Sequence, residues 1–180
     1  MKPIIIAIVG SSGCGKTTLT QHLSQVAKIP SVVSWTARPM RKGERSGREH
    51  WFTTTNFVPP RDQMIAHTIF SGFDYWVTRK DIQDLGNVMT YVIDEKGLMM
   101  LLEEHGEDYN IVPVLIKRDE DKLINDVGVK RVRRDIGRIR IDERTYEYII
   151  DNNGDLPDFL LQGMNVVAQI IQKYGSTSNK

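Results

Sequence analysis

Residues 10–17 read GSSGCGKT, and this stretch decides the fold. It matches the pattern G-x-x-x-x-G-K-[ST] in full and directly follows residues 4–9 (IIIAIV), a continuous apolar run. Such a run is typical of a strand buried on both faces of a parallel sheet. After the loop, Leu19, Leu23 and Val26 are spaced as on one face of a helix. The order strand, glycine-rich turn and helix predicts a loop that binds the phosphates of a nucleoside triphosphate.

The residue types in this loop suit a triphosphate. Glycines let backbone N–H groups converge on phosphate oxygens, and the start of the helix adds positive potential. Lys16 would reach the β- and γ-phosphates and the Thr17 hydroxyl would bind Mg²⁺, whereas a turn needed only for tight packing explains the glycines alone. Cys14 most simply fills space, although a thiol at a helix N-terminus can become reactive. We therefore predict ATP binding by Ser11, Ser12, Gly13, Cys14, Gly15, Lys16, Thr17 and Thr18, with Lys16 also catalytic and Thr17 also a metal ligand.

The remainder of the chain alternates strand patterns with helix patterns. Pro113 lies inside one of the strand patterns and counts against a central position for that strand, because proline has no N–H for the ladder. The alternation predicts an α/β fold with a mostly parallel sheet. The strand patterns lie at residues 32–33, 88–93, 111–116 and 148–150, and helical spacing occurs at residues 98–102 and 156–171.

Two stretches interrupt this alternation. Residues 36–85 are polar, aromatic and irregular, and we interpret them as a small insert and not as another strand–helix unit. Residues 118–142 are dense in charge and poor in core residues, which predicts a mobile flap.

The composition describes one globular domain. At 180 residues and 20.6 kDa, with 40% hydrophobic and 26% charged residues, the chain can bury a core without staples. No apolar run is long enough to span a bilayer, and the first run is a poor signal peptide because glycines and Lys16 follow it at once. A single cysteine can form neither an intramolecular disulfide nor a structural zinc site. We expect a cytoplasmic, single-domain protein, and the sequence leaves its oligomeric state open.

The distribution of charge is more informative than the total. A net charge of +1 argues against a general nucleic-acid coat or a membrane-surface binder. Residues 38–48 nevertheless carry a balance of +4 and residues 130–140 a balance of +5, so the rest of the chain sums to −8. Two arginine-rich segments on an acidic body predict sites for phosphates, and solvated helix faces are the alternative.

Comparison with the motifs of other nucleotide-binding enzymes limits the reactions that the protein could catalyse. A GTPase should carry D-x-x-G and N-K-x-D; residues 94–97 (DEKG) match the first and residues 152–155 (NNGD) echo the second, without the lysine that reads guanine. A kinase acting on an alcohol needs a general base, whereas one acting on a phosphate needs cations that hold two repelling polyphosphates together. The arginine-rich segments, with no obvious base-bearing motif beside them, favour a phosphate as the acceptor.

Residues 34–44 (SWTARPMRKGE), followed by Gly47 and Phe52, resemble the S-x-T-x-R-x-x-R-x-G-E…G…F signature of guanylate kinases. Residues 71–75 resemble the S-G-x-x-Y turn of that family, and residues 153–156 resemble its N-x-D-L motif before the last helix. The resemblance implies a P-loop three-layer sandwich and transfer of the ATP γ-phosphate to a nucleoside monophosphate, with GMP or dGMP as first guess and Mg²⁺ as cofactor. It divides the single domain, residues 1–180, into a core (1–35, 86–117 and 143–174), a monophosphate-binding insert (36–85) and a lid (118–142).

The resemblance also assigns the acceptor site. Glu44 would orient an arginine and would not touch the substrate. The lid would present arginines to the transferring phosphoryl group, and Arg118 is a further candidate at the preceding strand end. An arginine-rich RNA-binding helix is the rival interpretation of the lid, which the acidic remainder of the chain disfavours. The implied acceptor residues are Ser34, Arg38, Arg41, His50, Tyr75 and Asp94, and the implied catalytic lid residues are Arg131, Arg134 and Arg138, at i, i+3 and i+7. In the alternative interpretation, Arg38 and Arg41 are exposed loop charges and Tyr75 is an ordinary half-buried aromatic residue.

Four departures from the family concern substrate choice. His50 replaces a tyrosine, Ala66 stands where a glutamate reads the guanine edge, Val77 replaces a serine or threonine, and Val92 replaces the first of two aspartates. Asp94 remains as the clear carboxylate for a purine edge. A different base or deoxyribose form, or a ribose bisphosphate, therefore remains open as acceptor. A non-catalytic guanylate-kinase-like binding module is the alternative of another class, although such modules usually lack the intact phosphate loop that this chain keeps.

Overall fold

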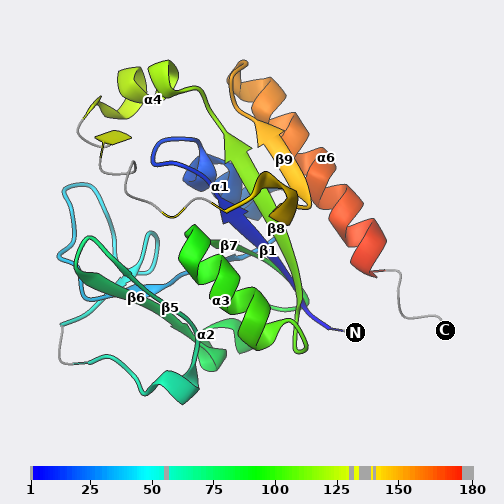
Figure 1. Cartoon of the computed structure of the whole chain (residues 1–180). Coiled ribbons are helices and arrows are strands. Elements are labelled where there is room, and N and C mark those ends of the chain that lie inside the picture. Colours follow the sequence, from blue (N-terminus) through cyan, green and yellow to red (C-terminus); the bar gives the residue numbers. More distant parts are fainter. Residues whose placement is uncertain (1, 55–56, 130–131, 134–138, 140, 176–180) are drawn as a thin grey trace.

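The computed structural model describes residues 2–54, 57–129, 132–133, 139 and 141–175 (Figure 1). Its central sheet has five strands in the order β2-β7-β1-β8-β9, and every neighbouring pair is parallel. The strands are β1 (Ile4–Val9), β2 (Ser31–Val32), β7 (Val88–Val92), β8 (Asn110–Lys117) and β9 (Tyr148–Asp151). The mostly parallel sheet predicted from the apolar runs is confirmed.

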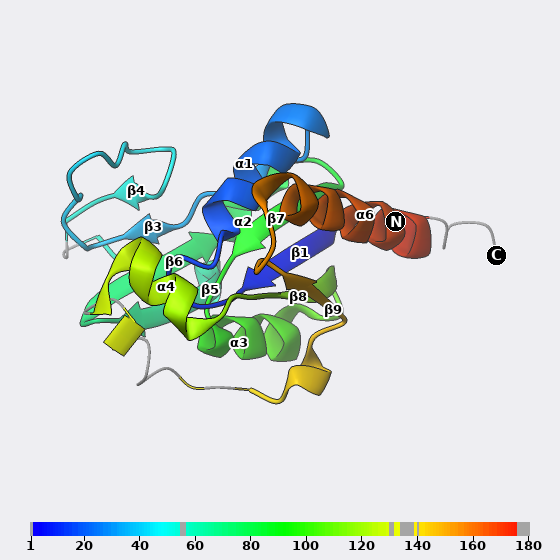
Figure 2. The same cartoon turned by 90° about the horizontal axis from the view of Figure 1, so that it is seen from above.

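Helices cover both faces of this sheet (Figure 2). On one face, α1 (Lys16–Val26) and α6 (Leu156–Gly175) pack against alternate residues of β1, and on the other face α3 (Glu95–His105) does so. Because β1 is covered on both sides, all six of its residues are buried. The three-layer α/β sandwich is therefore confirmed.

One detail of the central sheet differs from the prediction. Pro113 lies in β8, which is not an edge strand but stands between β1 and β9. Its carbonyl faces β9, where it accepts a hydrogen bond from the backbone N–H of Glu147. In a parallel strand the N–H and C=O of one residue point to the same side, so the missing N–H of Pro113 also faces β9. The pairing of β8 with β9 begins one position later, where Val114 lies opposite Tyr148. The missing N–H therefore removes no hydrogen bond between β8 and β1.

A second sheet, of four strands in the order β4-β3-β6-β5, lies beside the first. Strands β5 (Met64–Phe70) and β6 (Phe73–Thr78) form a hairpin whose turn residues, Ser71 and Gly72, both have positive φ. The strands β3 (Trp35–Thr36) and β4 (Trp51–Phe52) have only two residues each. All three tryptophans of the chain lie on strands of this sheet, at positions 35, 51 and 76. The stretch predicted to be irregular thus contains an ordered mixed sheet.

Short helices complete the described chain. The 3₁₀ helix η1 (Arg61–Gln63) precedes β5, and α2 (Arg79–Gln83) follows β6. Arg61 forms an ion pair with Glu104 of α3 at 2.7 Å, which ties the second sheet to the core. Beyond β8 lie α4 (Glu120–Val127) and the 3₁₀ helix η2 (Glu143–Thr145). In the described part of the chain, no helix has both the length and the apolar character that crossing a bilayer requires.

Candidate functional site

The phosphate loop joins β1 to α1. Gly15, at the N-cap of α1, has φ +106, and a Cβ there would lie 2.6 Å from Nδ2 of Asn152. That amide donates a 2.8 Å hydrogen bond to the carbonyl oxygen of Cys14, so the end of β9 holds the loop in place. The Cys14 side chain is buried in the core, where it fills space as predicted. The loop shape therefore depends on a glycine at one position and on an amide from the far side of the sheet.

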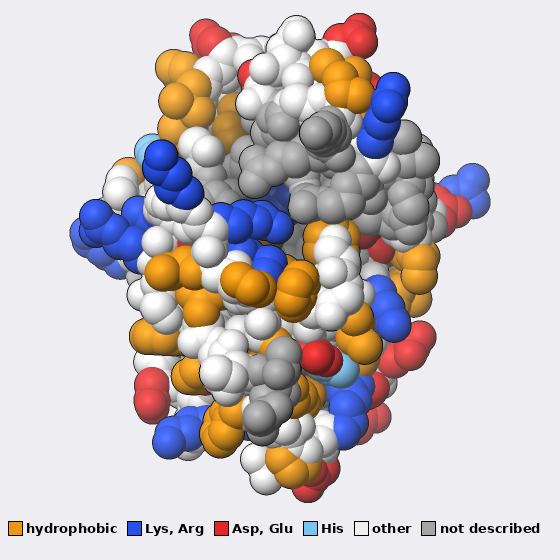
Figure 3. Space-filling model, turned by 90° about the vertical axis from the view of Figure 1, so that its left-hand side faces the viewer, with side chains coloured by type: hydrophobic (Ala, Val, Ile, Leu, Met, Phe, Trp, Pro, Cys, Tyr) orange, Lys and Arg blue, Asp and Glu red, His pale blue; other side chains and the backbone are white. Residues whose placement is uncertain are grey.

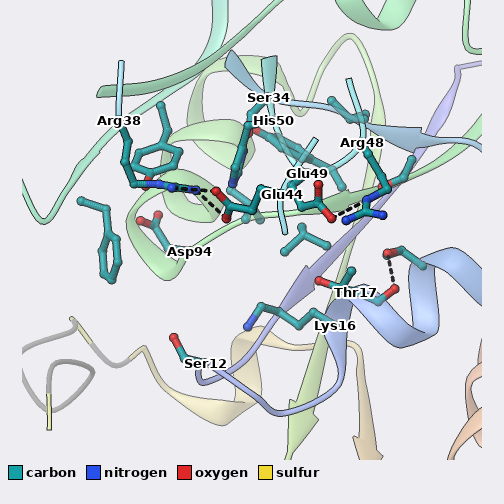
Figure 4. A pocket seen from close by; sticks show the side chains of 18 of the residues that line it. Ser12, Lys16, Thr17, Ser34, Arg38, Glu44, Arg48, Glu49, His50 and Asp94 are labelled. Carbon is teal, nitrogen blue, oxygen red and sulfur yellow. Dashed lines mark hydrogen bonds and ion pairs between the residues drawn. The ribbon is translucent and has the colours of Figure 1, made fainter. Parts of the chain in front are cut away.

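Lys16 lies over the loop. Its ammonium group donates to the carbonyl oxygens of Gly10 and Ser11 at 2.7 and 2.8 Å. The Lys16 and Thr17 side chains both line a cavity of about 490 Å³, a volume typical of sites for small ligands (Figure 4).

This cavity unites the two predicted halves of the site. On the face shown in Figure 3, lysine and arginine side chains gather around a hollow, in keeping with a site for anions. From the phosphate loop, Ser12, Gly13, Lys16 and Thr17 line the cavity. All six predicted acceptor residues line it too, namely Ser34, Arg38, Arg41, His50, Tyr75 and Asp94.

Arg38 is held by a partly buried ion pair. Its two terminal nitrogens donate to the two carboxylate oxygens of Glu44, each at 2.9 Å, and its Nε donates to the Tyr75 hydroxyl at 3.1 Å. Burial opposes the charge of Arg38, but these hydrogen bonds outweigh it and raise its pKa. Burial would likewise raise the pKa of Glu44, and the hydrogen bonds from Arg38 and from the Arg41 backbone N–H lower it. The guanidinium fork of Arg38 is directed at Glu44, which itself lines the cavity. That Glu44 does not touch the substrate stays a prediction.

His50 and Ser34 form a second polar pair. Ser34 Oγ and His50 Nδ1 lie 2.9 Å apart, and the imidazole packs edge-on against the rings of Phe52 and Tyr75. Burial, followed by the charge of Arg38, lowers the pKa of His50 to about 4. The imidazole is therefore neutral at pH 7.

Asp94 caps α3. Its Oδ1 accepts a 2.7 Å hydrogen bond from the backbone N–H of Gly97. The aspartate of the D-x-x-G match at residues 94–97 is thus a helix N-cap, and the glycine fits close packing, because a Cβ at Gly97 would lie 2.7 Å from Cγ1 of Ile93. The carboxylate also lines the cavity, below the Arg38–Glu44 pair in Figure 4. Asp94 can thus stabilise the helix with one oxygen and face a ligand with the other.

A second cavity, of about 260 Å³, lies on the other side of the phosphate loop. Gly13 lines both cavities, and Gly15, Thr18 and Phe159 line the smaller one. Arg118 lines it as well, held by hydrogen bonds to the Asn152 carbonyl at 2.5 Å and to Asp126 at 2.6 Å. The predicted lid candidate Arg118 is therefore placed beside the loop, whereas Arg131, Arg134 and Arg138 lie outside the described residues.

Several cavity residues were missed by the sequence analysis. Ala66 and Val77, the positions expected to read guanine in the family, are buried in the core and do not line the cavity. Their neighbours do: Thr68 lies two residues after Ala66, and Tyr91 lies near the carboxyl end of β7. The rule that ligands gather at the carboxyl ends of parallel strands could have found Tyr91. The other missed lining residues include Arg48, Glu49 and Phe70.

Comparison with known proteins gives consistent relatives. No family model matches the chain. A guanylate kinase from Anaplasma phagocytophilum is 28% identical over 169 residues, which cover 83% of this chain and 79% of that protein. A guanylate kinase from Helicobacter hepaticus is 45% identical over 116 residues, 59% of this chain and 56% of that protein. The chain thus spans four fifths of the first relative and about half the length of the second.

A solved structure has the same fold. The crystal structure of guanylate kinase from Anaplasma phagocytophilum matches with a TM-score of 0.68 over 98% of this chain and 89% of that one. Sequence identity in this superposition is 22%, so the likeness establishes the architecture. Sequence and structure comparisons point to one group of proteins, the group whose motifs the chain carries.

Proposed function

We propose that the chain is a member of the guanylate kinase family and, from its relatives and the geometry of its cavities, that it is an ATP-dependent nucleoside monophosphate kinase. The acceptor is a (deoxy)nucleoside monophosphate, with GMP or dGMP as the first to test. One observation carries the proposal: Lys16 and Thr17 of the phosphate loop line the same cavity as Ser34, Arg41 and Tyr75. A single cavity can therefore hold a donor phosphate and an acceptor phosphate next to each other.

ATP binds across both cavities, with its nucleoside in one and its terminal phosphates in the other. The smaller cavity takes the nucleoside end of ATP, and the polyphosphate crosses the loop at Gly13, which lines both cavities. Backbone N–H groups of the loop and the N-terminus of α1 hold the phosphate oxygens. The Lys16 ammonium exchanges its carbonyl partners for the β- and γ-phosphate oxygens, where it offsets negative charge in the transition state.

The acceptor side binds the monophosphate through charge and hydroxyl groups. Arg41 supplies the guanidinium that faces the phosphate, and Ser34, His50 and Tyr75 supply neutral polar contacts. Arg38 acts largely through Tyr75, because its nitrogens already donate to Glu44, Tyr75 and the Pro39 carbonyl. An oxygen of the acceptor phosphate attacks the γ-phosphorus, and the bond from that phosphorus to the ADP oxygen breaks. Since the attacking oxygen is already anionic, no general base is required.

The residues of the loop fit Mg²⁺ as cofactor. The Thr17 side chain lines the cavity next to Lys16, and the described residues contain no cluster of three acidic, histidine or cysteine side chains that would bind a metal by themselves. This donor set suits Mg²⁺, which takes few protein ligands and keeps phosphate oxygens and waters. Thr17 would hold the ion, which when bound neutralises charge on the transferring phosphate.

The direct test is ADP release with each nucleoside monophosphate, each deoxy form and ribose bisphosphate in turn, with and without Mg²⁺. We expect Mg²⁺-dependent turnover that is fastest with GMP or dGMP. Lys16→Ala should lower kcat about 10³-fold or more, because a cation is removed from a phosphoryl-transfer site. Lys28→Ala is the matched control, since Lys28 lies just beyond the C-terminal end of α1, away from the phosphate loop, and is exposed. Binding of GMP without any turnover would favour the binding-module alternative.

A further inference from the structure

Three polar side chains line the part of the 490 Å³ cavity that lies between the second sheet and the core; in the proposed function this part holds the acceptor. They are Thr68 of β5, Tyr91 of β7 and Asp94 at the start of α3. None of them contacts the Arg38–Glu44 pair through a hydrogen bond of the described residues. Asp94 was predicted to face the acceptor, whereas Tyr91 carries no role in the function proposed above.

The ring of Tyr91 is fixed by core packing. Its side chain is 5% exposed and belongs to the hydrophobic cluster that contains Ala66, Val77, Ile93 and Leu98. Ala66 and Val77 lie opposite each other on β5 and β6, and neither reaches the cavity. On the side of the cavity formed by β7, the lining residue is therefore a tyrosine whose ring packs in an apolar cluster.

The hydroxyl of Tyr91 has no partner within the described residues. No hydrogen bond joins it to another described group, and it is not among the polar atoms that are sealed from solvent without a partner. Because Tyr91 lines the cavity, its oxygen is available to a ligand there. Burial, together with the Asp94 and Asp81 carboxylates, raises the pKa of Tyr91, so the phenol stays neutral and can donate a hydrogen bond.

Asp94 offers the complementary group. Its Oδ1 accepts from the Gly97 N–H, and its other carboxylate oxygen remains for a ligand. One donor and one acceptor in the same cavity match a base that presents a ring N–H beside a carbonyl oxygen, as guanine does. If either the protein group or the base group of such a hydrogen-bonded pair is removed, the acceptor binds less tightly, because the remaining polar group is desolvated without a partner.

We propose that Tyr91 is a specificity-determining residue of the acceptor site, whose O–H donates to a carbonyl oxygen of the acceptor base while Asp94 accepts from the adjacent ring N–H. This inference rests on the proposed function and names the substrate class of that same site: monophosphates of bases with an N–H next to a C=O. The phenol supplies from β7 a polar contact that Ala66 and Val77 cannot make from the second sheet.

The test pairs one variant with two acceptors. Tyr91→Phe removes only the hydroxyl, and 6-thio-GMP replaces the base carbonyl oxygen by sulfur, a weaker acceptor. We expect Tyr91→Phe to lower kcat/KM for GMP about fivefold to tenfold, the loss of one neutral hydrogen bond, and to change kcat/KM for 6-thio-GMP less than about twofold. Tyr148→Phe, in β9 on the opposite side of the sheet, is the matched control and should change neither value.

Three results would overturn the inference. An equal loss with both acceptors would show that the hydroxyl acts on packing, and no loss with GMP would show that it does not touch the base. A lower thermal unfolding midpoint for Tyr91→Phe would show that the hydroxyl has a partner inside the protein. Absence of turnover by the unmodified chain with every monophosphate would instead contradict the proposed function, and the inference would fall with it.

Discussion

The half-buried imidazole of His50 gives the protein a pH-dependent stability. The pKa of His50 is lowered from 6.5 to about 4, so between these values the unfolded chain binds a proton that the folded chain does not. The stabilisation that depends on the neutral ring is complete above pH 6.5 and is lost as the pH falls to about 4. At most about 3.5 kcal/mol of the free energy of unfolding is involved.

Unfolding midpoints measured between pH 7 and 4 on the wild-type chain and on His50→Phe check this prediction. The variant keeps an aromatic ring beside Phe52 and Tyr75 but has no group that titrates there. We expect its midpoint to fall less steeply with acid than that of the wild type. Equal slopes for the two proteins would contradict the assignment of this pH dependence to His50.

Asp94 combines a structural and a ligand-facing role that two substitutions separate. Asp94→Asn keeps an oxygen that can accept from the Gly97 N–H, so the helix cap and the unfolding midpoint should be preserved. It should nevertheless lower kcat/KM for GMP about tenfold or more, because the carboxylate facing the base is lost.

Asp94→Ala should in addition destabilise the fold by about 1 kcal/mol, the usual value of an N-cap. Steady-state kinetics over a range of Mg²⁺ concentrations and thermal unfolding distinguish the roles. A changed Mg²⁺ requirement with an unchanged acceptor preference would assign Asp94 to the metal and not to the base.

At the scale of elements, the phosphate loop depends on β9. Asn152→Ala would leave the carbonyl of Cys14 without its amide partner, which costs about 1–3 kcal/mol when the group is buried. Because the loop binds ATP in the proposed function, we expect the KM for ATP to rise several-fold and the KM for the acceptor to change little. Asn165→Ala, on the exposed side of α6, is the matched control. Equal effects on both substrates would show that the amide supports the whole cavity.

Elements differ in how readily the sequence predicts them. The runs that became β1, β7 and β8 are long and apolar on both faces, so their pattern is unambiguous. The strands β3 and β4 have two residues each, too few for any periodicity, and their pairing depends on contacts between segments distant in the chain. A sheet held together in this way looks irregular in the sequence.

The site shows the same contrast. Ser34, Arg38 and Arg41 belong to one motif of fixed spacing and Tyr75 to a second one. All six predicted acceptor residues line one cavity, although their contacts with substrate remain predictions. Tyr91 belongs to no motif, and its place in the cavity follows from its position near the carboxyl end of β7 and from its packing with Ala66 and Val77 of the second sheet. The lid arginines lie outside the described residues, so their catalytic role also remains a prediction.

At the scale of the whole molecule, all three tryptophans lie on the four-stranded sheet, so the intrinsic fluorescence of the protein reports on that sheet. Trp35 and Trp51 lie with ring centroids 5.7 Å apart, and Trp35 donates to Asp81 at 3.0 Å. Trp76 is buried beside Trp35, whereas the five-stranded sheet and its helices carry no tryptophan. Tryptophan fluorescence therefore originates from the four-stranded sheet alone, which in the proposed function carries acceptor-binding residues. We expect titration with GMP to shift the emission and titration with ATP to leave it nearly unchanged, so binding of the acceptor can be followed separately on the unlabelled protein. An equal response to both nucleotides would show that ATP also displaces the four-stranded sheet.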